Sequence, residues 1–251
     1  MKQGKSTDQK PYNYYRVPQN TAICIVGLPG VGKTDLVKNL IYSNMDRFNI
    51  RIAFCESMSN KADYRFNAPF YIRSCKPEKI KLYFDLFIDA LTQHERRKAG
   101  DTDYDVPDPH LLLIVDDALD CSINFDSVKQ QTYWRDLLST ARHKNITVVF
   151  VVQTLHRAIP PAIRSMIKIW YIFKNGVEAE TLLKMLPLVK RKDGKTITKA
   201  SELKEYLQNA LDTKYSALYF RRDEHGPGLY GKLFHTVQAP SVEIEYKISR
   251  T

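Results

Sequence analysis

Runs of apolar residues recur along the chain, and each ends at polar residues or at a turn. Such a run, without alternation of polar residues, is typical of a strand covered on both faces in a parallel sheet. The clearest runs are 22–26, 111–115, 146–152 and 167–173, and shorter ones lie at 50–55 and 69–72. The pattern therefore predicts a mainly parallel sheet.

Helical patterns separate these runs. The longest begins at Pro77, a residue that suits a first helical turn, and continues with apolar residues at helical spacing to the cations at 96–98. Others lie at 35–41, around Trp134, and at 160–164. Because strands that alternate with helices build right-handed βαβ units, we expect an α/β fold with helices on both faces of the sheet.

The pattern also divides the chain into three parts. Residues 1–19 are polar and contain no apolar run, which predicts a flexible N-terminal arm, and residues 20–175 form the core. Residues 176–251 predict a small α+β C-terminal appendage. It comprises helices near 178–185 and 201–211 and a hairpin of 216–220 with 229–234.

The first apolar run leads into a phosphate-binding loop, the P-loop. Gly27, Gly32, Lys33 and Thr34 fill every fixed position of G-x-x-x-x-G-K-[ST], between a strand and a helix as the motif demands. The glycines let backbone N–H groups turn towards phosphate oxygens, and the helix adds its positive N-terminal end. Lys33 would contact the β- and γ-phosphates, and the Thr34 hydroxyl would bind Mg²⁺. The expected nucleotide-binding residues are Gly27, Leu28, Pro29, Gly30, Val31, Gly32, Lys33, Thr34 and Asp35.

Polar residues that suit hydrolysis follow two other apolar runs. Asp116 ends the run at 111–115, where its carboxylate would complete the Mg²⁺ site. Asp117 follows directly and would activate the attacking water, although it could also be a helix N-cap. Gln153 ends the run at 146–152. If that strand lies between the P-loop strand and the Asp116 strand, Gln153 would face the γ-phosphate and sense whether it is present, although it could also be a buried amide that joins two strands.

An arginine is also expected, because phosphoryl transfer spreads charge onto oxygens that a guanidinium stabilises. The candidates are Arg142, before the Gln153 strand, and Arg164, after it. Each could act on its own nucleotide or on that of a neighbouring subunit, or be a surface or DNA-contacting cation. We favour Arg142 acting on the neighbouring subunit's nucleotide.

Composition narrows the class of protein. No apolar run approaches the roughly 20 residues of a membrane helix, and the N-terminus lacks the apolar stretch of a secretory signal, so we expect neither a membrane span nor secretion. The net charge is +10, from 38 Lys+Arg against 28 Asp+Glu, and the pI is about 9.3. This balance favours a polyanionic partner, nucleic acid first, although it could merely keep the protein soluble.

The motifs in this order resemble the FtsK/HerA superfamily of DNA-pumping ATPases. The similarity rests on the P-loop, on the run that ends in Asp116-Asp117, and on the segment from Arg142-His143 through Gln153 to Pro160–Arg164. In particular it points to the viral branch, the genome-packaging ATPases of nucleocytoplasmic large DNA viruses and virophages. It covers about residues 20–175, and the rest of the chain matches nothing in that pattern.

The resemblance implies a RecA-like P-loop ATPase core of the ASCE type, with ATP and Mg²⁺ as its cofactors. It implies a homo-oligomeric ring, a pentamer or hexamer, that moves double-stranded DNA independently of sequence and packages a viral genome. Capsid or vertex proteins would be further partners, and the host cytoplasm, a viral factory or the virion the place of action. Basic stretches at 190–195 and 221–222 would be pore elements or solvated surface.

Three other classes of protein share some or all of these residues. A cellular FtsK/HerA-type DNA pump would use the same ones. A small-molecule kinase explains the P-loop but gives no task to Asp117 and Gln153 together. A GTPase-like switch requires a guanine-selecting Asn-Lys-x-Asp sequence, and residues 60–63 carry those letters too early in the chain to lie beside a base.

Overall fold

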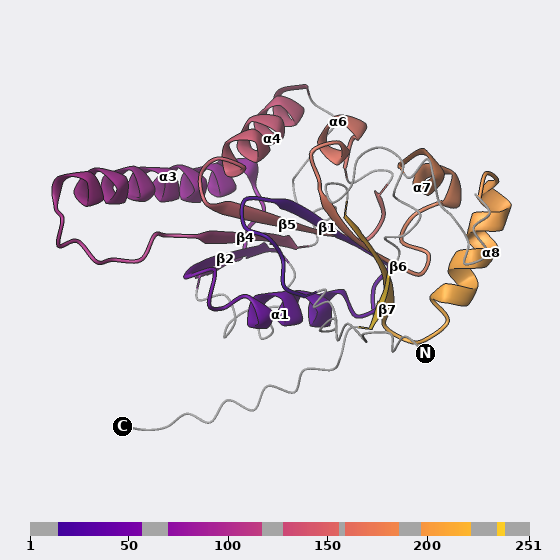
Figure 1. Cartoon of the computed structure of the whole chain (residues 1–251). Coiled ribbons are helices and arrows are strands. Elements are labelled where there is room, and N and C mark those ends of the chain that lie inside the picture. Colours follow the sequence, from indigo (N-terminus) through magenta and orange to yellow (C-terminus); the bar gives the residue numbers. More distant parts are fainter. Residues whose placement is uncertain are drawn as a thin grey trace, which may run out of the picture.

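The protein is built on one twisted sheet of eight strands (Figure 1). The computed structural model describes residues 15–56, 70–116, 128–155, 159–185, 197–221 and 235–238. Along the sheet the strands follow the order β3-β2-β4-β5-β1-β6-β7-β8. Their bounds are β1 Ala22–Val26, β2 Ile50–Cys55, β3 Phe70–Ile72, β4 Leu111–Asp116, β5 Ile146–Val152, β6 Ile169–Phe173, β7 Ser216–Arg221 and β8 His235–Gln238.

The first six strands are parallel, while β7 is antiparallel to β6 and β8 is antiparallel to β7. The predicted α/β class and mainly parallel sheet are confirmed. The strand β5 lies between β1 and β4, which is the arrangement on which the interpretation of Gln153 depends.

Helices cover both faces of the sheet. Their bounds are α1 Lys33–Ser43, α3 Pro77–Gly100, α4 Val128–Ala141, α6 Pro161–Arg164, α7 Ala179–Met185 and α8 Ala200–Ala210. On one face, the alternate strand residues that include Ile23 and Ile25 pack against Leu36, Leu40 and Ile41 of α1. The other face carries the core to which α3, α4, α6, α7 and α8 contribute. Figure 1 shows α1 on one side of the sheet and α3, α4 and α6 on the other.

The C-terminal third shares the core sheet. The strand β7 pairs with the whole length of β6, from Ile169 opposite Arg221 to Phe173 opposite Ala217. The partner of β7 is β8, at 235–238, and the segment 229–234 that we expected to fill this place lies outside the described residues. The basic stretch 190–195 and Arg222 also lie outside them.

Residues 15–19, which the sequence pattern assigned to a flexible arm, pack against the end of α1. The Asn44 side chain is fully buried; its amide donates to the carbonyls of Tyr15 at 2.6 Å and Leu40 at 2.7 Å, and its oxygen accepts from Val17 N–H at 3.1 Å. Val17 itself is buried in the α1-side core. This part of the segment therefore belongs to the packed fold, and residues 1–14 lie outside the described ones.

Among the helices of the described ranges, none combines the length and the apolar character that crossing a bilayer requires.

Candidate functional site

The P-loop occupies the carboxyl end of β1 and continues into α1. Gly32 (φ 100°), a fixed glycine of the motif, and Gly30 (φ 77°), at a variable position, adopt left-handed conformations that a side chain would strain. The Lys33 ammonium donates to the carbonyls of Gly27 at 2.6 Å and Leu28 at 3.0 Å. It thus lies across the loop, where it can exchange these carbonyls for phosphate oxygens.

Asp116 and Gln153 lie on the same edge and the same face as the P-loop helix. In the register of the sheet, Asp116 stands opposite Val151 of β5, and Val152 stands opposite Val26 of β1. Because side chains alternate along a strand, Asp116 takes the parity of Leu112 and Ile114, which face α1. Gln153 continues the parity of Val149 and Val151, which face α1 as well.

A backbone hydrogen bond fixes these elements to one another. The Gly27 N–H donates to the Val152 carbonyl at 3.1 Å, which joins the start of the P-loop to the residue that precedes Gln153. The structure therefore brings together Lys33, Thr34, Asp116 and Gln153, four of the residues that the sequence predicted for the site. Asp117 lies outside the described residues, so its role stays a prediction.

The groups present suit a magnesium ion. Thr34, in the first turn of α1, offers a hydroxyl, and Asp116, only 3% exposed, offers a carboxylate at the end of β4. Mg²⁺ takes oxygen ligands, keeps several waters and needs only one or two carboxylates when phosphates are also present. The described residues contain no cluster of three or more His, Cys, Asp or Glu side chains that would indicate a metal cage of protein ligands alone.

Arg164 lies on the opposite face and holds the chain segment that follows Gln153. Its guanidinium donates to the carbonyls of Ile159 at 2.6 Å and Leu155 at 3.2 Å. Burial lowers the pKa of Arg164, and the neighbouring Cys24 thiol partly offsets this. These contacts give Arg164 a structural task, and a catalytic task for it stays a prediction.

Arg142 lies at the amino edge of the sheet, away from the P-loop. It follows α4 and precedes β5, and its exposed guanidinium donates to the Met166 carbonyl at 3.1 Å, just before β6 begins. The seven residues of β5, at about 3.3 Å each, separate this edge from Gln153. Arg142 therefore does not reach its own nucleotide site. Its action on a neighbouring subunit's nucleotide, like the alternative of a surface or DNA-contacting cation, stays a prediction.

Two turns that the sequence analysis did not assign to the site pack against the P-loop. A Cβ added to Gly27 would lie 2.7 Å from Phe173 Cβ, and one added to Gly176 would lie 2.8 Å from the Val26 carbonyl oxygen. A Cβ added to Gly32 would lie 2.9 Å from Cδ1 of Tyr215. The Asn175-Gly176 dipeptide is a turn signal that could have drawn attention to the first turn. Nothing in the sequence marks Tyr215.

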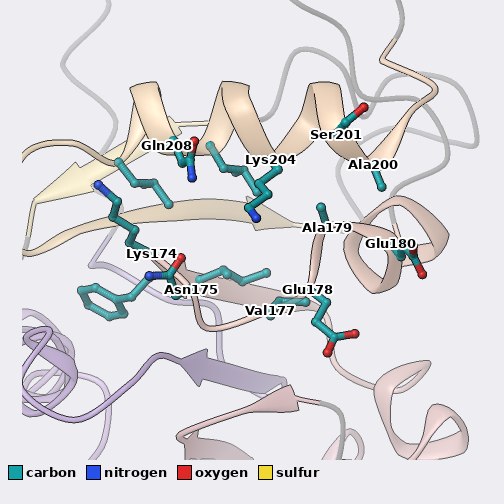
Figure 2. Close-up of a pocket in the computed structure, with 14 residues that line it drawn as sticks. Lys174, Asn175, Val177, Glu178, Ala179, Glu180, Ala200, Ser201, Lys204 and Gln208 are labelled. Atoms are coloured by element: carbon teal, nitrogen blue, oxygen red, sulfur yellow. The ribbon is translucent and has the colours of Figure 1, made fainter.

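A cavity of about 490 Å³ lies beside this edge, between α8 and the segment after β6. Figure 2 shows Lys204 and Gln208 of α8 on one side, with Lys174 and Asn175 on the other. Its apolar wall includes Leu207 of α8, which packs on the core of the sheet face opposite α1. The cavity therefore adjoins the turn that supports Gly27.

Several solved structures share this fold. The chain is similar to the pCW3 conjugation coupling protein TcpA (12% identity, TM-score 0.53, 87% of this chain and 60% of that one). It is also similar to EssC ATPases 2 and 3 from Geobacillus thermodenitrificans (13%, 0.56, 89% and 40%). A third is the genome packaging NTPase B204 of Sulfolobus turreted icosahedral virus 2, in complex with sulfate (12%, 0.52, 80% and 90%). The chain thus spans less than two thirds of TcpA and EssC but nearly all of B204, and the RecA-like fold is confirmed.

Sequence comparison identifies the family. The search of the curated proteins found no match to the chain. A family model does match, over residues 13–210, and it covers the P-loop, Asp116, Gln153 and the turn that contains Gly176, whereas Tyr215 lies beyond the matched residues. That model describes the poxvirus A32 protein, which confirms the resemblance to the viral branch: the chain belongs to the poxvirus A32 protein family.

Proposed function

We propose that this chain hydrolyses ATP to move double-stranded DNA during the packaging of a viral genome. The observation that carries the proposal is the convergence of Lys33, Asp116 and Gln153 on one edge and one face of the sheet, which the position of β5 between β1 and β4 produces. A site that only bound a nucleotide would need the P-loop alone.

Each residue has a task in hydrolysis. Lys33 leaves the carbonyls of Gly27 and Leu28 and neutralises charge on the β- and γ-phosphates. Thr34 and Asp116 would hold Mg²⁺, which neutralises charge on the phosphate oxygens. Gln153, fixed to the P-loop through the Val152–Gly27 hydrogen bond, orients the attacking water or senses the γ-phosphate.

The transition state also needs an arginine to stabilise its charge. Within a single chain, neither Arg142 nor Arg164 supplies this group at the carboxyl edge of the sheet. We assign this task to Arg142 of a neighbouring subunit. Arg164 is partly buried and donates to two carbonyls of its own chain, whereas Arg142 is exposed at the far edge and donates to the Met166 carbonyl. The nucleotide site is then completed only in a ring, and hydrolysis in one subunit is coupled to contact with the next.

Charge and family support DNA as the partner. A net charge of +10 favours a polyanion, and a motor that moves DNA must grip phosphates without reading bases. The family is that of the poxvirus A32 protein, and B204, which shares the fold, is named as a genome packaging NTPase. Capsid or vertex proteins as further partners, and action in the host cytoplasm or viral factory, complete the proposal.

The function is tested by ATP hydrolysis with and without long double-stranded DNA. We expect DNA to stimulate hydrolysis, and we expect K33A and Q153A to lose at least about a hundredfold in kcat, since each removes charge neutralisation or positioning in the transition state. Hydrolysis that is indifferent to DNA and survives K33A would contradict the proposal.

The task of Arg142 is tested by mixing variants. R142A and K33A should each be inactive alone, whereas a mixture should recover activity, because the intact P-loop of one subunit meets the intact Arg142 of another. R135A, which removes another exposed arginine from α4, is the matched control and should retain activity. A mixture that stays inactive would exclude Arg142 as the arginine that acts between subunits.

A further inference from the structure

The strand order indicates in which direction a bound nucleotide extends from the P-loop. Asp116 and Gln153, which serve the metal and the γ-phosphate, lie on the β5 and β4 side of β1. The strands β6 and β7 lie on its other side. A nucleotide whose phosphates occupy the P-loop therefore extends its ribose and base towards the ends of β6 and β7 that meet this edge.

The residue nearest the P-loop on that side is Tyr215, which directly precedes β7. Its ring is half-buried, and it lies so close to Gly32 that a Cβ there would be 2.9 Å from Cδ1 and 3.4 Å from Cγ. Gly32 is the N-cap of α1, one residue before the P-loop lysine. The aromatic ring thus lies next to the backbone that binds phosphate, on the side where the nucleoside must lie.

The backbone of Tyr215 is held in a conformation that tyrosine seldom adopts. Its φ is 64°, in the left-handed region, at the end of a turn in which Ser216 N–H donates to the Thr213 carbonyl at 3.1 Å. A bulky residue there costs conformational energy, and such residues concentrate at ligand-binding sites. On the other neighbouring turn the left-handed residue is Asn175 (φ 61°), a type that tolerates this region.

The Lys214 side chain lies over the face of the Tyr215 ring. The Lys214 ammonium lies 4.8 Å from the ring centroid, on an exposed side chain that can move away. A purine base can stack face to face on the same ring surface. The ring therefore presents a surface that accepts a flat partner.

We propose that Tyr215 is the platform on which the base of the bound nucleotide stacks, so that the turn before β7 selects a nucleoside and the P-loop selects its phosphates. The inference rests on the proposed binding of a nucleoside triphosphate at the P-loop. It assigns to the C-terminal part of the chain a direct contact with the nucleotide.

The test compares a ligand that has a base with one that has none. Binding of ATP and of inorganic tripolyphosphate, both with Mg²⁺, is measured by calorimetry for the wild type, Y215F and Y215L. Leucine keeps an apolar side chain against Gly32 but removes the ring. We expect Y215L to weaken ATP binding about tenfold, in the range known for base–aromatic stacking, and to leave tripolyphosphate binding unchanged. Y215F should bind both as the wild type does.

A fluorescent variant gives a second measurement. In Y215W the new indole should be quenched by ATP and not by tripolyphosphate, while the native Trp134 and Trp170 are fully buried. Equal weakening of both ligands in Y215L, or equal ATP binding in wild type and Y215L, would overturn the proposal. ATP binding that survives K33A would instead refute the P-loop site itself, so the two failures can be told apart.

Discussion

Gly176 provides a sharp test of how the fold supports the P-loop. It lies in the turn after β6, and its backbone contacts the last residue of β1 and the first glycine of the P-loop. In G176A the new Cβ would lie 2.8 Å from the Val26 carbonyl oxygen, 3.0 Å from the Val26 carbonyl carbon and 3.1 Å from Gly27 Cα. All three neighbours are backbone atoms, so the contact cannot be relieved by a change of rotamer.

The magnitude follows from these distances. Ordinary van der Waals contact begins at 3.4 Å, so the turn and β1 must separate by about 0.6 Å, the difference between 3.4 and 2.8 Å. Overpacking of this kind costs about 1–3 kcal/mol, and the alanine returns about 0.4–1 kcal/mol by restricting the unfolded chain. We therefore expect a net loss of about 1–2 kcal/mol, which for a chain of this size lowers Tm by about 2–8 °C.

Thermal unfolding and ATP hydrolysis together check this reasoning. G100A is the matched control, because no heavy atom lies within 4 Å of a Cβ at that position, the last residue of α3. It should leave Tm unchanged or raise it slightly. Because the shift in G176A falls on the start of the P-loop, kcat/KM for ATP should drop about tenfold in that variant alone. Equal Tm and equal kcat/KM in the two variants would refute the argument.

Three further changes probe other parts of the molecule. N44A removes three hydrogen bonds of a fully buried side chain and should lower the free energy of unfolding by about 2–3 kcal/mol, measured by urea denaturation, with faster hydrogen exchange at Val17. R164K keeps the charge but cannot hold two carbonyls in the same fork, so kcat should fall more than ATP affinity does. Burial lowers the pKa of His110 in the folded protein. Near pH 6 the unfolded chain therefore binds more protons at this residue than the folded chain does. Stability should therefore decline as pH falls below about 6.5, and this part of the decline should be absent in H110Q.

The fold class could be predicted because a strand that is buried on both faces of a sheet consists of a continuous run of apolar residues. The runs at 22–26, 111–115 and 146–152 became β1, β4 and β5 with bounds within a residue of those expected. The P-loop was equally local, since its glycines, lysine and threonine are consecutive or nearly so. Asp116 and Gln153 could be predicted because parallel strands end at a common edge, and the prediction for Gln153 then depended only on the position of β5.

The contacts that support the P-loop were beyond the sequence pattern, because they join distant parts of the chain. Whether Tyr215 reaches Gly32 depends on β7 joining β6 antiparallel and in one register, which periodicity does not specify. The sequence divided the chain at 175 and assigned what followed to an appendage. The sheet continues across that point, and for this reason the turn before β7 can lie against the nucleotide site.

The two edges of the sheet bear on the proposed role of Arg142. Gln153 and Asp116 lie at the carboxyl edge, whereas Arg142 lies at the amino edge, separated from them by the length of β5, about 20 Å. No rotamer of arginine spans that distance, so a transition-state role for Arg142 requires a second subunit whose amino edge faces the first subunit's P-loop. Repetition of such a head-to-tail contact produces a ring when the rotation closes. The position of one arginine thus links hydrolysis to assembly, and the mixing experiment with R142A and K33A tests both at once.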